Sequence, residues 1–475
     1  MDVASPRFET NAREALADPQ LQKALGHIKT GFIERRRRAA ERLPEFEALR
    51  DAAKAIKDHT LANLDVYLER FEARVAENGG KVHWARDAKE AREIVLAICR
   101  DANARTATKG KTMVAEEIGL NDYLEANGIE PVETDLGEYI IQLRREPPSH
   151  IIAPAIHVNK EQVAEAFRAA HTELPPDRAL EEPPTLLAEA RAMLRRKFLA
   201  ADVGITGANF LVAETGSTVI VTNEGNGDLT QTLPRVHVVL ASIEKVVPTL
   251  EDLSTILRVL ARSATGQEFS VYTTVSTGPR RAKDLDGPEQ FHVVILDNGR
   301  SSMLGTPFQE MLRCIRCGAC LNHCPVYGAI GGHAYGWVYP GPMGAVLTPW
   351  LVGLEQARHL PEASTFCGKC ESVCPMRIPL PGLMRRLREK AFTERLTPPR
   401  ARWALRAWAF AARRPALYAP LSLLGARLLS LLGGRRGAIA ALPFARGWTD
   451  SRDMPAPEGA TFQSLWKSQA QRMER

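Results

Sequence analysis

The feature that most constrains this chain of 475 residues is a pair of cysteine motifs in its last third. The first motif has the spacing C-x2-C-x2-C-x3-C-P and contains Cys314, Cys317, Cys320 and Cys324. The second has the spacing C-x2-C-x3-C-P and contains Cys367, Cys370 and Cys374. Three thiolates at three-residue intervals can surround a cuboidal iron–sulfur cluster, and the fourth cysteine of such a run ligates a neighbouring cluster. The spacing therefore predicts two adjacent clusters with crossed ligation.

Crossed ligation divides the seven cysteines into two ligand sets. Cluster A takes Cys314, Cys317, Cys320 and Cys374, whereas cluster B takes Cys324, Cys367 and Cys370 and is one ligand short. A full pattern would have cysteine at Ser364, so the last corner is held by Ser364, by another residue such as His323 or His359, or by water, or its iron is absent. The expected cofactors are a [4Fe-4S] cluster A and a [4Fe-4S] or [3Fe-4S] cluster B.

Structural zinc and disulfides are the alternative uses of such cysteines. Zinc sites take four ligands, typically as two C-x2-C pairs, and leave a third thiolate at the same interval without a role. Disulfides are disfavoured because the N-terminal stretch has no apolar signal-peptide core, so we expect a reducing compartment. Cys99, outside both motifs, lies in an apolar run and is expected to be a buried filler.

Apolar periodicity divides the chain into four regions. We expect a helical N-terminal arm over 1–75, an α/β domain over 76–300, a helical two-cluster domain over 301–395, and a basic helical region and tail over 396–475. Apolar runs alternating with amphipathic helices favour a largely parallel sheet covered on both faces. The predicted strands are 81–84, 111–114, 130–133, 139–143, 210–214, 218–222, 237–241, 270–274 and 292–296.

Three polar loops, 204–209, 214–217 and 223–228, adjoin strands of this predicted sheet. One interpretation is that the Gly, Asn and Asp residues of these loops only form turns. The other is that the loops form a pocket for an anion or a hydroxy acid, in which the backbone N–H groups donate hydrogen bonds to the ligand. Ligands of parallel sheets gather beyond the carboxyl ends of the strands. The basic residues that can face such a pocket are Lys109, Lys111, Arg235, His237, Lys245 and Arg280. Both interpretations stay open, and no catalytic residue is identified.

Charge is unevenly distributed along the chain. Residues 376–450 contain 15 Lys and Arg against 3 Asp and Glu, a net charge of +12. The whole chain has a net charge of +6, so the remaining residues have a net charge of −6. We expect this region to dock on an acidic partner subunit or an anionic lipid surface, and we expect no nucleic-acid binding because no recognised motif accompanies the charge. No apolar run approaches the ~20 residues of a membrane span. The expected location is the cytoplasm, with peripheral contact at the inner face of the membrane.

Several stretches, together with both cysteine motifs, resemble the lactate-utilisation iron–sulfur protein B family. They are residues 111–120, 133–139, 148–154, 204–209, 223–226, 233–237 and 447–453, and they extend over nearly the whole chain. The resemblance implies a lactate-utilisation (LUD) domain of the NagB/RpiA/CoA-transferase-like type, followed by a ferredoxin-like two-cluster domain. It also implies a role in oxidising L-lactate to pyruvate beside two partner proteins, and it assigns the seven cysteines to clusters.

Three functions are compatible with these features. The favoured one is an electron-transfer subunit, because oxidation of a 2-hydroxy acid releases two electrons and each cluster carries one. The second is a catalyst in which an incompletely ligated cluster B binds the hydroxy acid directly. The third is an assembly scaffold whose clusters only brace the fold.

Overall fold

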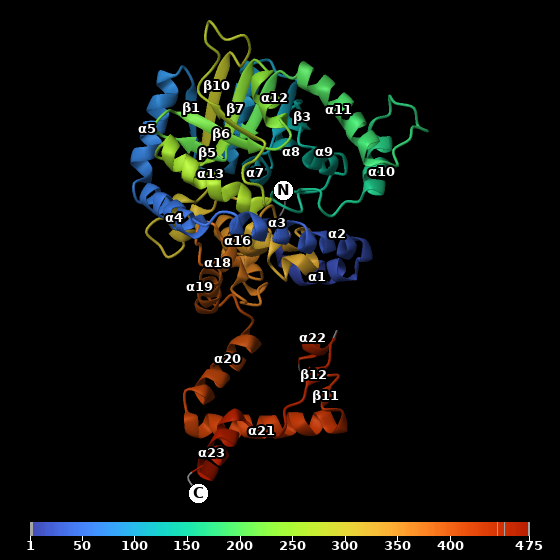
Figure 1. Ribbon diagram of the computed structural model, residues 1–475, viewed down its shortest axis with the longest axis vertical. Helices are drawn as coiled ribbons and strands as arrows, with labels where there is room; N and C mark the ends of the chain where they lie inside the picture. The colour runs from blue at the N-terminus through green and yellow to red at the C-terminus, as the bar shows by residue number, and fades with distance from the viewer. Residues whose placement is uncertain (1–2, 444, 451, 474–475) are drawn as a thin grey trace. The chain divides into compact units, whose positions relative to one another are not determined.

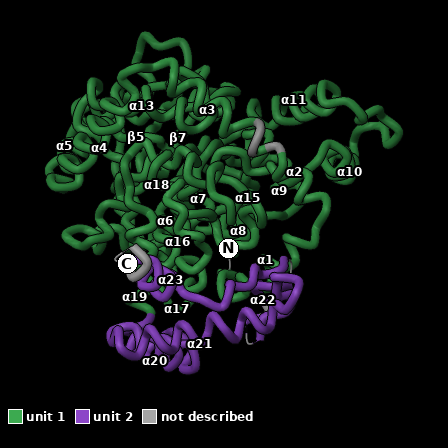
Figure 2. Tube along the Cα trace, turned by 60° about the horizontal axis from the view of Figure 1, so that its bottom comes forward, with its two compact units in different colours: residues 1–391 green, residues 392–475 purple. Residues whose placement is uncertain are grey.

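The computed structural model describes residues 3–443, 445–450 and 452–473 (Figure 1). It contains two compact units, residues 1–391 and residues 392–475 (Figure 2). The first unit contains the main sheets and both cysteine motifs, and the second is mostly helical.

The first unit is built around a six-stranded sheet in which every neighbouring pair is parallel. In sheet order the strands are β1 (Lys81–Ala85), β10 (Gln290–Leu296), β7 (Val236–Ser242), β4 (Val203–Gly207), β2 (Thr106–Gly110) and β3 (Glu130–Glu133). Strands β7 and β4 are buried at every position, as is typical of a parallel sheet covered on both faces. The predicted parallel sheet is confirmed.

Alternate residues of β7 enter two different hydrophobic cores, because side chains of a strand point to opposite faces. Val238 and Leu240 pack in the core formed with helices α6 (Ala88–Asp101), α7 (Met113–Ile118) and α8 (Leu120–Glu125). Val239 and Ala241 pack in the core formed with α5 (Leu64–Glu77), β5 (Phe210–Val212) and β8 (Val246–Val247). The sheet is therefore held between two layers.

A smaller sheet and its helices complete the α/β region. Its strand order is β8, β5, β6 (Ser217–Thr222) and β9 (Tyr272–Ser276), with antiparallel pairing from β5 to β9. The remaining helices are α9 (Leu136–Leu143), α10 (Lys160–Ala170), α11 (Pro183–Ala200), α12 (Asn226–Thr232) and α13 (Leu250–Ala264). Helices α9, α10 and α11 share a third core with β3.

Several predicted elements differ from the structure. Residues 139–143 were expected as a strand but belong to α9, because the Asp135 carboxylate accepts the Gly137 N–H at 3.0 Å and caps a helix. Residues 111–114 were expected as a strand, but Lys111 has φ 43° and Thr112 caps α7. Residues 204–207 were expected in a loop but form most of β4.

The cysteine motifs lie among short helices, and the N-terminal arm packs against them (Figure 1). The arm comprises η1 (Ser5–Arg7), α1 (Phe8–Ala17), α2 (Pro19–Thr30), α3 (Phe32–Glu41) and α4 (Phe46–Ala62). The later helices are α14 (Ala319–Asn322), α15 (Tyr327–Ile330), α16 (Gly341–Leu351), α17 (Leu354–Ala357), α18 (Lys369–Val373) and α19 (Leu380–Thr393). The remaining 3-10 turns of this unit are η2 (Ile243–Lys245), η3 (Ser301–Met303), η4 (Gln309–Arg313), η5 (His333–Tyr335) and η6 (Leu360–Glu362).

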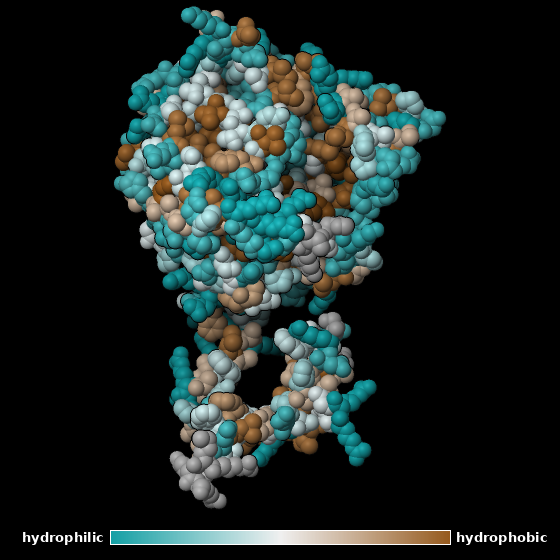
Figure 3. Space-filling model, viewed as in Figure 1, coloured by the Kyte–Doolittle hydropathy of each residue, from teal (hydrophilic) through white to brown (hydrophobic). Residues whose placement is uncertain are grey.

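The second unit exposes both apolar and basic side chains (Figure 3). Its elements are α20 (Pro399–Ala412), α21 (Pro415–Gly433), η7 (Gly434–Arg436), β11 (Ala438–Ile439), α22 (Arg446–Thr449), β12 (Met454–Pro455) and α23 (Phe462–Met473). The sequence had suggested no membrane-spanning run, whereas among the described residues the helical stretch Pro415–Arg436 is long and apolar enough to cross a membrane by length and composition. Little of it is buried within the structure.

Candidate iron–sulfur sites and an adjoining cavity

The two cysteine motifs form loops of the same local conformation. In the first loop Arg316 (φ 58°) and Gly318 (φ 73°) are left-handed on either side of Cys317, and α14 follows. In the second loop Phe366 (φ 53°) and Gly368 (φ 76°) are left-handed on either side of Cys367, and α18 follows. The repeat places Ser364 where the first loop has Cys314.

Four cysteines from both motifs line one internal cavity. They are Cys314, Cys317, Cys320 and Cys374. Most of the remaining lining is apolar, including Ile315, Met343 and Ile378. Four thiols converging from two chain segments on a largely apolar space have the donor chemistry of a [4Fe-4S] site. The cavity supports the assignment of these cysteines to cluster A, which remains a prediction.

Burial acts strongly on the thiols around this cavity. It raises the pKa of Cys317 to about 12 and that of Cys374 to about 11, with neighbouring cysteines contributing in the same direction. Among the described residues, no three His, Cys, Asp or Glu side chains are placed to hold a single metal ion.

The cysteines predicted for cluster B differ in exposure. Cys324 and Cys370 are buried, whereas Cys367 is exposed. Burial raises the pKa of Cys370 to about 12, and the neighbouring Cys324 and Cys367 act in the same direction. Mutual influence of these three thiols is expected of groups that share one site.

The candidates for the fourth ligand of cluster B are in different environments. Ser364 is partly buried, and its Oγ accepts a hydrogen bond from the Phe366 N–H at 3.1 Å. His323 Nδ1 lies 2.9 Å from the carbonyl oxygen of Ala319. His359 is partly buried. Only Ser364 occupies the position equivalent to a cluster A cysteine.

Arginines from the N-terminal arm hold the second motif in place, a role that the sequence analysis missed. Arg50 is 3% exposed, and it donates from Nη2 to the carbonyl oxygens of Ser372 at 2.8 Å and Cys374 at 2.7 Å. Arg36 Nη2 donates to the carbonyl oxygen of Val373 at 2.9 Å. Their partners lie more than 300 residues away in sequence, so no local pattern could reveal the contacts.

A buried charge network joins the first motif to the parallel-sheet domain. Arg316 Nη2 lies 3.0 Å from Glu244 Oε1, and Arg300 Nε lies 3.2 Å from Glu244 Oε2. Arg300 also pairs with Glu117 Oε2 at 2.5 Å, and Tyr339 donates to that oxygen at 2.7 Å. Burial disfavours the Glu244 carboxylate, but Arg300 and Arg316 outweigh it and lower its pKa to about 2. Glu244 therefore stays charged and links the two regions.

A second cavity, of about 130 Å³, adjoins the carboxyl ends of β2 and β4. Of the six basic residues expected at an anion pocket, Lys111 and Lys245 line it, and Arg316, which the sequence analysis did not include, joins them. Burial lowers the pKa of Lys245 to about 8.

The other four basic residues have different roles. Lys109 is buried and paired with Glu116 and Glu133 at 2.5 and 2.6 Å, and Arg280 pairs with Glu289 at 2.9 Å. His237 Nε2 lies 2.8 Å from Thr206 Oγ1, and Arg235 is exposed. None of the four lines the cavity at β2 and β4.

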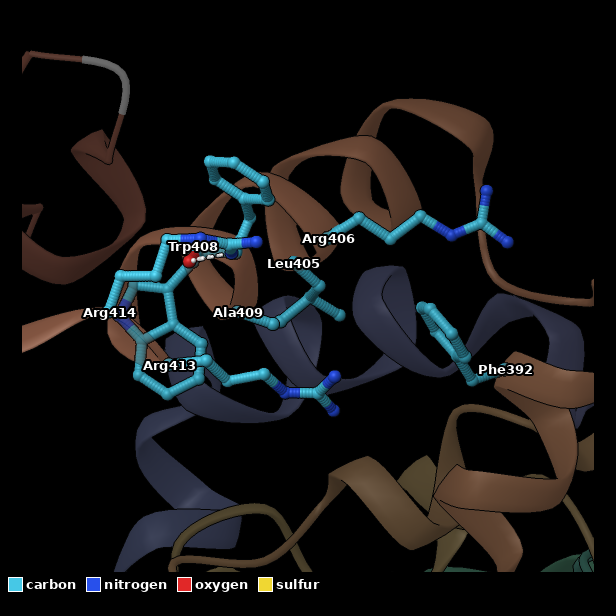
Figure 4. A pocket seen from close by; sticks show the side chains of 8 residues that line it. Phe392, Leu405, Arg406, Trp408, Ala409, Arg413 and Arg414 are labelled. Carbon is cyan, nitrogen blue, oxygen red and sulfur yellow. Dashed lines mark hydrogen bonds between the residues drawn. The ribbon is translucent and has the colours of Figure 1, made fainter. Parts of the chain in front are cut away.

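A cavity of about 790 Å³ belongs to the second unit and has no acid, thiol or histidine in its lining (Figure 4). It is lined by Phe392, Leu405, Arg406, Trp408, Ala409, Phe410, Arg413 and Arg414. Arg414 lies 3.7 Å from the centre of the Phe410 ring. The lining suits contact with an acidic or apolar surface more than catalysis.

Comparisons with known families match most of the chain. A LUD domain model matches residues 68–296, a 4Fe-4S dicluster domain model matches 310–378, and a model of the lactate utilisation protein B C-terminal region matches 392–471. One solved structure, a DUF162 family protein from Deinococcus radiodurans, covers 49% of this chain and 98% of its own at 13% identity. Its TM-score is 0.28.

Curated relatives are similar over nearly their full length. The "Uncharacterized electron transport protein YkgF" of Escherichia coli is 42% identical over 97% of this chain and 96% of its own. "Lactate utilization protein B" is 42% identical in Macrococcus caseolyticus, over 99% of both chains, and 40% identical in Bacillus subtilis, over 100% of this chain and 98% of that one. With its LUD domain and its 4Fe-4S dicluster domain, the chain belongs to the lactate utilisation protein B family.

Proposed function

We propose that this protein is the iron–sulfur electron-transfer subunit of a system that oxidises L-lactate to pyruvate. The relatives' names, lactate utilization protein B and electron transport protein, support this role, as does the match to a 4Fe-4S dicluster domain. The observation that carries the proposal is the cavity lined by Cys314, Cys317, Cys320 and Cys374 from two separate motifs. When bound, two clusters would supply one-electron steps.

The proposed ligands follow from the loops. Cluster A is held by the four cysteines of the cavity, and cluster B by Cys324, Cys367 and Cys370 with Ser364 as the candidate fourth ligand. Contact between α14 and α18 supports neighbouring sites, because each helix begins just after a left-handed glycine of its own motif. The nuclearity of cluster B, four irons or three, belongs to the same proposal.

Buried arginines of the chain hold the site in place. Arg50 and Arg36 donate to carbonyl oxygens of the second motif, which fixes the loop that carries Cys374. Arg313, which is 2% exposed, donates to the carbonyl oxygens of Met376 at 3.3 Å and Arg377 at 3.1 Å. Buried cations and peptide groups near a cluster tune its reduction potential.

Finer features of the fold are also proposed. The LUD domain is of the NagB/RpiA/CoA-transferase-like type, and the cluster domain is a helical ferredoxin-like one. The parallel sheet with helices on both faces supports the first, and the short helices after both motifs support the second.

We propose that the protein works in the cytoplasm with partner proteins and an electron acceptor, and that the second unit docks on an acidic partner or on anionic lipid at the inner face of the membrane. The exposed Trp403, Trp408 and Phe410, 69%, 63% and 57% exposed, accompany the basic side chains of Arg406, Arg413 and Arg414. Aromatic and basic residues together suit such a surface.

The test of the electron-transfer role uses anaerobically purified full-length protein with counted iron and sulfide. We expect L-lactate to reduce the clusters, seen by low-temperature EPR, only when the partner proteins are present. Reduction by lactate with this chain alone would move catalysis into it. Clusters that stay redox-inert with all partners present would favour the scaffold function.

A further inference from the structure

The cavity at the carboxyl ends of β2 and β4 is built between two parts of the first unit. Lys111, Gly207 and Lys245 come from the parallel-sheet region, and Arg316 and Tyr339 come from the region of the cysteine motifs. This is the edge of a parallel sheet at which ligands bind. The cavity therefore has the location of a ligand site.

Two cations of this cavity have a charge that ion pairs compensate only in part. Lys245 is 7% exposed and forms no hydrogen bond or ion pair in the part of the chain that the structure describes, although Glu244 and Cys314 lie near enough to act on its charge. The side chain of Arg316 is 10% exposed, and its Nη1 is buried with no hydrogen-bond partner there, although its Nη2 binds Glu244. Buried charges are normally paired, so both groups point to an anion.

The surrounding buried carboxylates supply only part of the negative charge that these two cations require. Glu244 is shared between Arg300 and Arg316, and Glu117 pairs with Arg300. Lys111, at the same cavity, is different because it pairs with Asp135 and Glu224, each at 3.3 Å. The remaining positive charge therefore lies at Lys245 and Arg316, beside the Cys314 thiol of the proposed cluster A site.

The cavity adjoins the cysteine-lined one. Ile151 and Arg316 line both cavities. A ligand in the second cavity would therefore lie beside the site proposed for cluster A.

We propose that this cavity binds a small carboxylate bearing a hydroxyl or keto oxygen on the adjacent carbon, with Lys245 and Arg316 facing the carboxylate. The inference rests on the proposed function, because it places the 2-hydroxy or 2-oxo acid of that reaction class on this chain.

Size and polarity agree with this ligand class. A cavity of about 150 Å³ in another protein holds a six-carbon ring, and the cavity of about 130 Å³ here suits an acid of similar heavy-atom count. Glu138 lines the same space, and burial together with Glu133 and Asp135 raises its pKa well above the ordinary value. A protonated carboxyl can donate to a hydroxyl or keto oxygen.

The test is isothermal titration of the anaerobic, cluster-loaded full chain with L-lactate, D-lactate, pyruvate, propionate and inorganic phosphate. The variants are Lys245→Met, Lys245→Arg, Ala208→Leu, which narrows the cavity and keeps both cations, and Lys283→Met as a control at an exposed lysine. We expect lactate or pyruvate to bind at least tenfold more tightly than propionate or phosphate. Lys245→Met and Ala208→Leu should each weaken that binding at least tenfold, whereas Lys245→Arg and Lys283→Met should retain it.

A second readout is the midpoint potential of the clusters. Bound carboxylate should lower one cluster's potential in the wild-type chain and not in Lys245→Met, because negative charge disfavours the reduced form. The inference is overturned if the wild-type chain binds no carboxylate, if phosphate binds as tightly, or if Ala208→Leu binds unchanged. A Lys245→Met shift in the ligand-free potential without any binding to the wild type would assign the lysine to the cluster alone, and would also overturn it.

These outcomes are independent of the electron-transfer test. Binding can fail while lactate still reduces the clusters through partner proteins, in which case the proposed function stands and the site does not. Binding can also succeed while no electrons reach the clusters, which would reject the electron-transfer role and keep the site. If Lys245→Met does not incorporate iron, Ala208→Leu decides the question.

Discussion

Arg50 and Cys374 are joined by two hydrogen bonds, from Nη2 at 2.7 Å and from Nε at 3.2 Å, both to the carbonyl oxygen of Cys374. The guanidinium belongs to the N-terminal arm, and the carbonyl belongs to the last cysteine of the second motif. Such charge-assisted bonds in a buried place are stronger than neutral ones. The arm therefore fixes part of the proposed cluster A site.

Arg50→Met should loosen this loop and speed the loss of cluster A. Hydrogen bonds from charged donors contribute about 1.5–3 kcal/mol each, so we expect a cost on the order of 3 kcal/mol. The measurement is the decay of visible absorbance in the presence of an iron chelator. Arg37→Met is the control, because the Arg37 side chain is 54% exposed and its surface ion pairs are screened by solvent. Equal decay in the two variants would contradict the prediction.

Ser364→Cys should give cluster B a fourth cysteine and make it more resistant to oxygen and chelator. The reason is the shared loop conformation that places Ser364 where the first motif has Cys314. Ser364→Ala should lose an iron from cluster B, seen as a three-iron EPR signal. Ser372→Ala, a change at an exposed serine of α18, is the matched control. Identical spectra for all three variants would remove Ser364 from the ligand set.

Cys374→Ser should lower the iron content by about half, since one of two clusters would lose a ligand. Cys99→Ala should leave iron unchanged, because Cys99 is buried in the core with α6 and lines neither cavity. Iron and sulfide counting after anaerobic purification compares the two. Loss of iron from Cys99→Ala would show that the assay reports stability and not ligation.

Stability should rise between about pH 8 and pH 10.5 because of Lys57. Burial lowers the pKa of Lys57 from 10.5 to about 8, although its ammonium donates to the carbonyl oxygens of Glu244 at 2.5 Å and Val246 at 3.1 Å. In this window the unfolded chain binds more protons than the folded one, so unfolding becomes less favourable as pH increases, by up to about 3 kcal/mol. The denaturant midpoint of the wild type should therefore rise relative to that of Lys57→Met as the pH increases through this window, because only the wild type gains stability. Parallel curves would reject the assignment to Lys57.

Vesicle binding should depend on the basic groups of the second unit. Replacing Arg406, Arg413 and Arg414 by Glu should abolish co-sedimentation with anionic vesicles at low salt, because each basic residue contributes about 1 kcal/mol near such a surface. Neutral vesicles are the control. Release of the wild type by high salt would indicate peripheral contact, whereas release by detergent alone would indicate that Pro415–Arg436 inserts. If the protein binds neither anionic nor neutral vesicles, the proposed docking surface for the second unit is an acidic partner protein.

Elements whose signals are local were predictable from the sequence. The helical pattern of residues 183–200 predicts a helix that coincides with α11, Pro183–Ala200, which begins with proline at its first position. The strand expected over 130–133 coincides with β3. By contrast, β-branched and aromatic residues suggested a strand at 139–143, where the Asp135 cap and packing against α10 and α11 produce a helix.

The candidate sites were only partly accessible to sequence reasoning. The spacing of the cysteines is a local signal, so the sequence alone indicates which cysteines are ligands. The assignment of these cysteines to cluster A or cluster B stays a prediction. Arg50, Arg36 and Arg316 resemble solvent-exposed charges in the sequence, and their burial depends on partners far along the chain. The same limit explains why six basic residues were candidates for the anion pocket and only Lys111 and Lys245 line it.

The contact between the arm and the second motif also sets an order of events during biosynthesis. The two ends of the Arg50–Cys374 contact are 324 residues apart, so at about 5–20 residues per second a ribosome needs about 16 to 65 s to make the partner of Arg50. During that interval the arginine has no carbonyl to bind, and the arm cannot close over the motif. The second motif is therefore accessible for iron delivery during one interval. The interval begins when Cys374 leaves the exit tunnel, and it ends when the N-terminal arm packs against the motif.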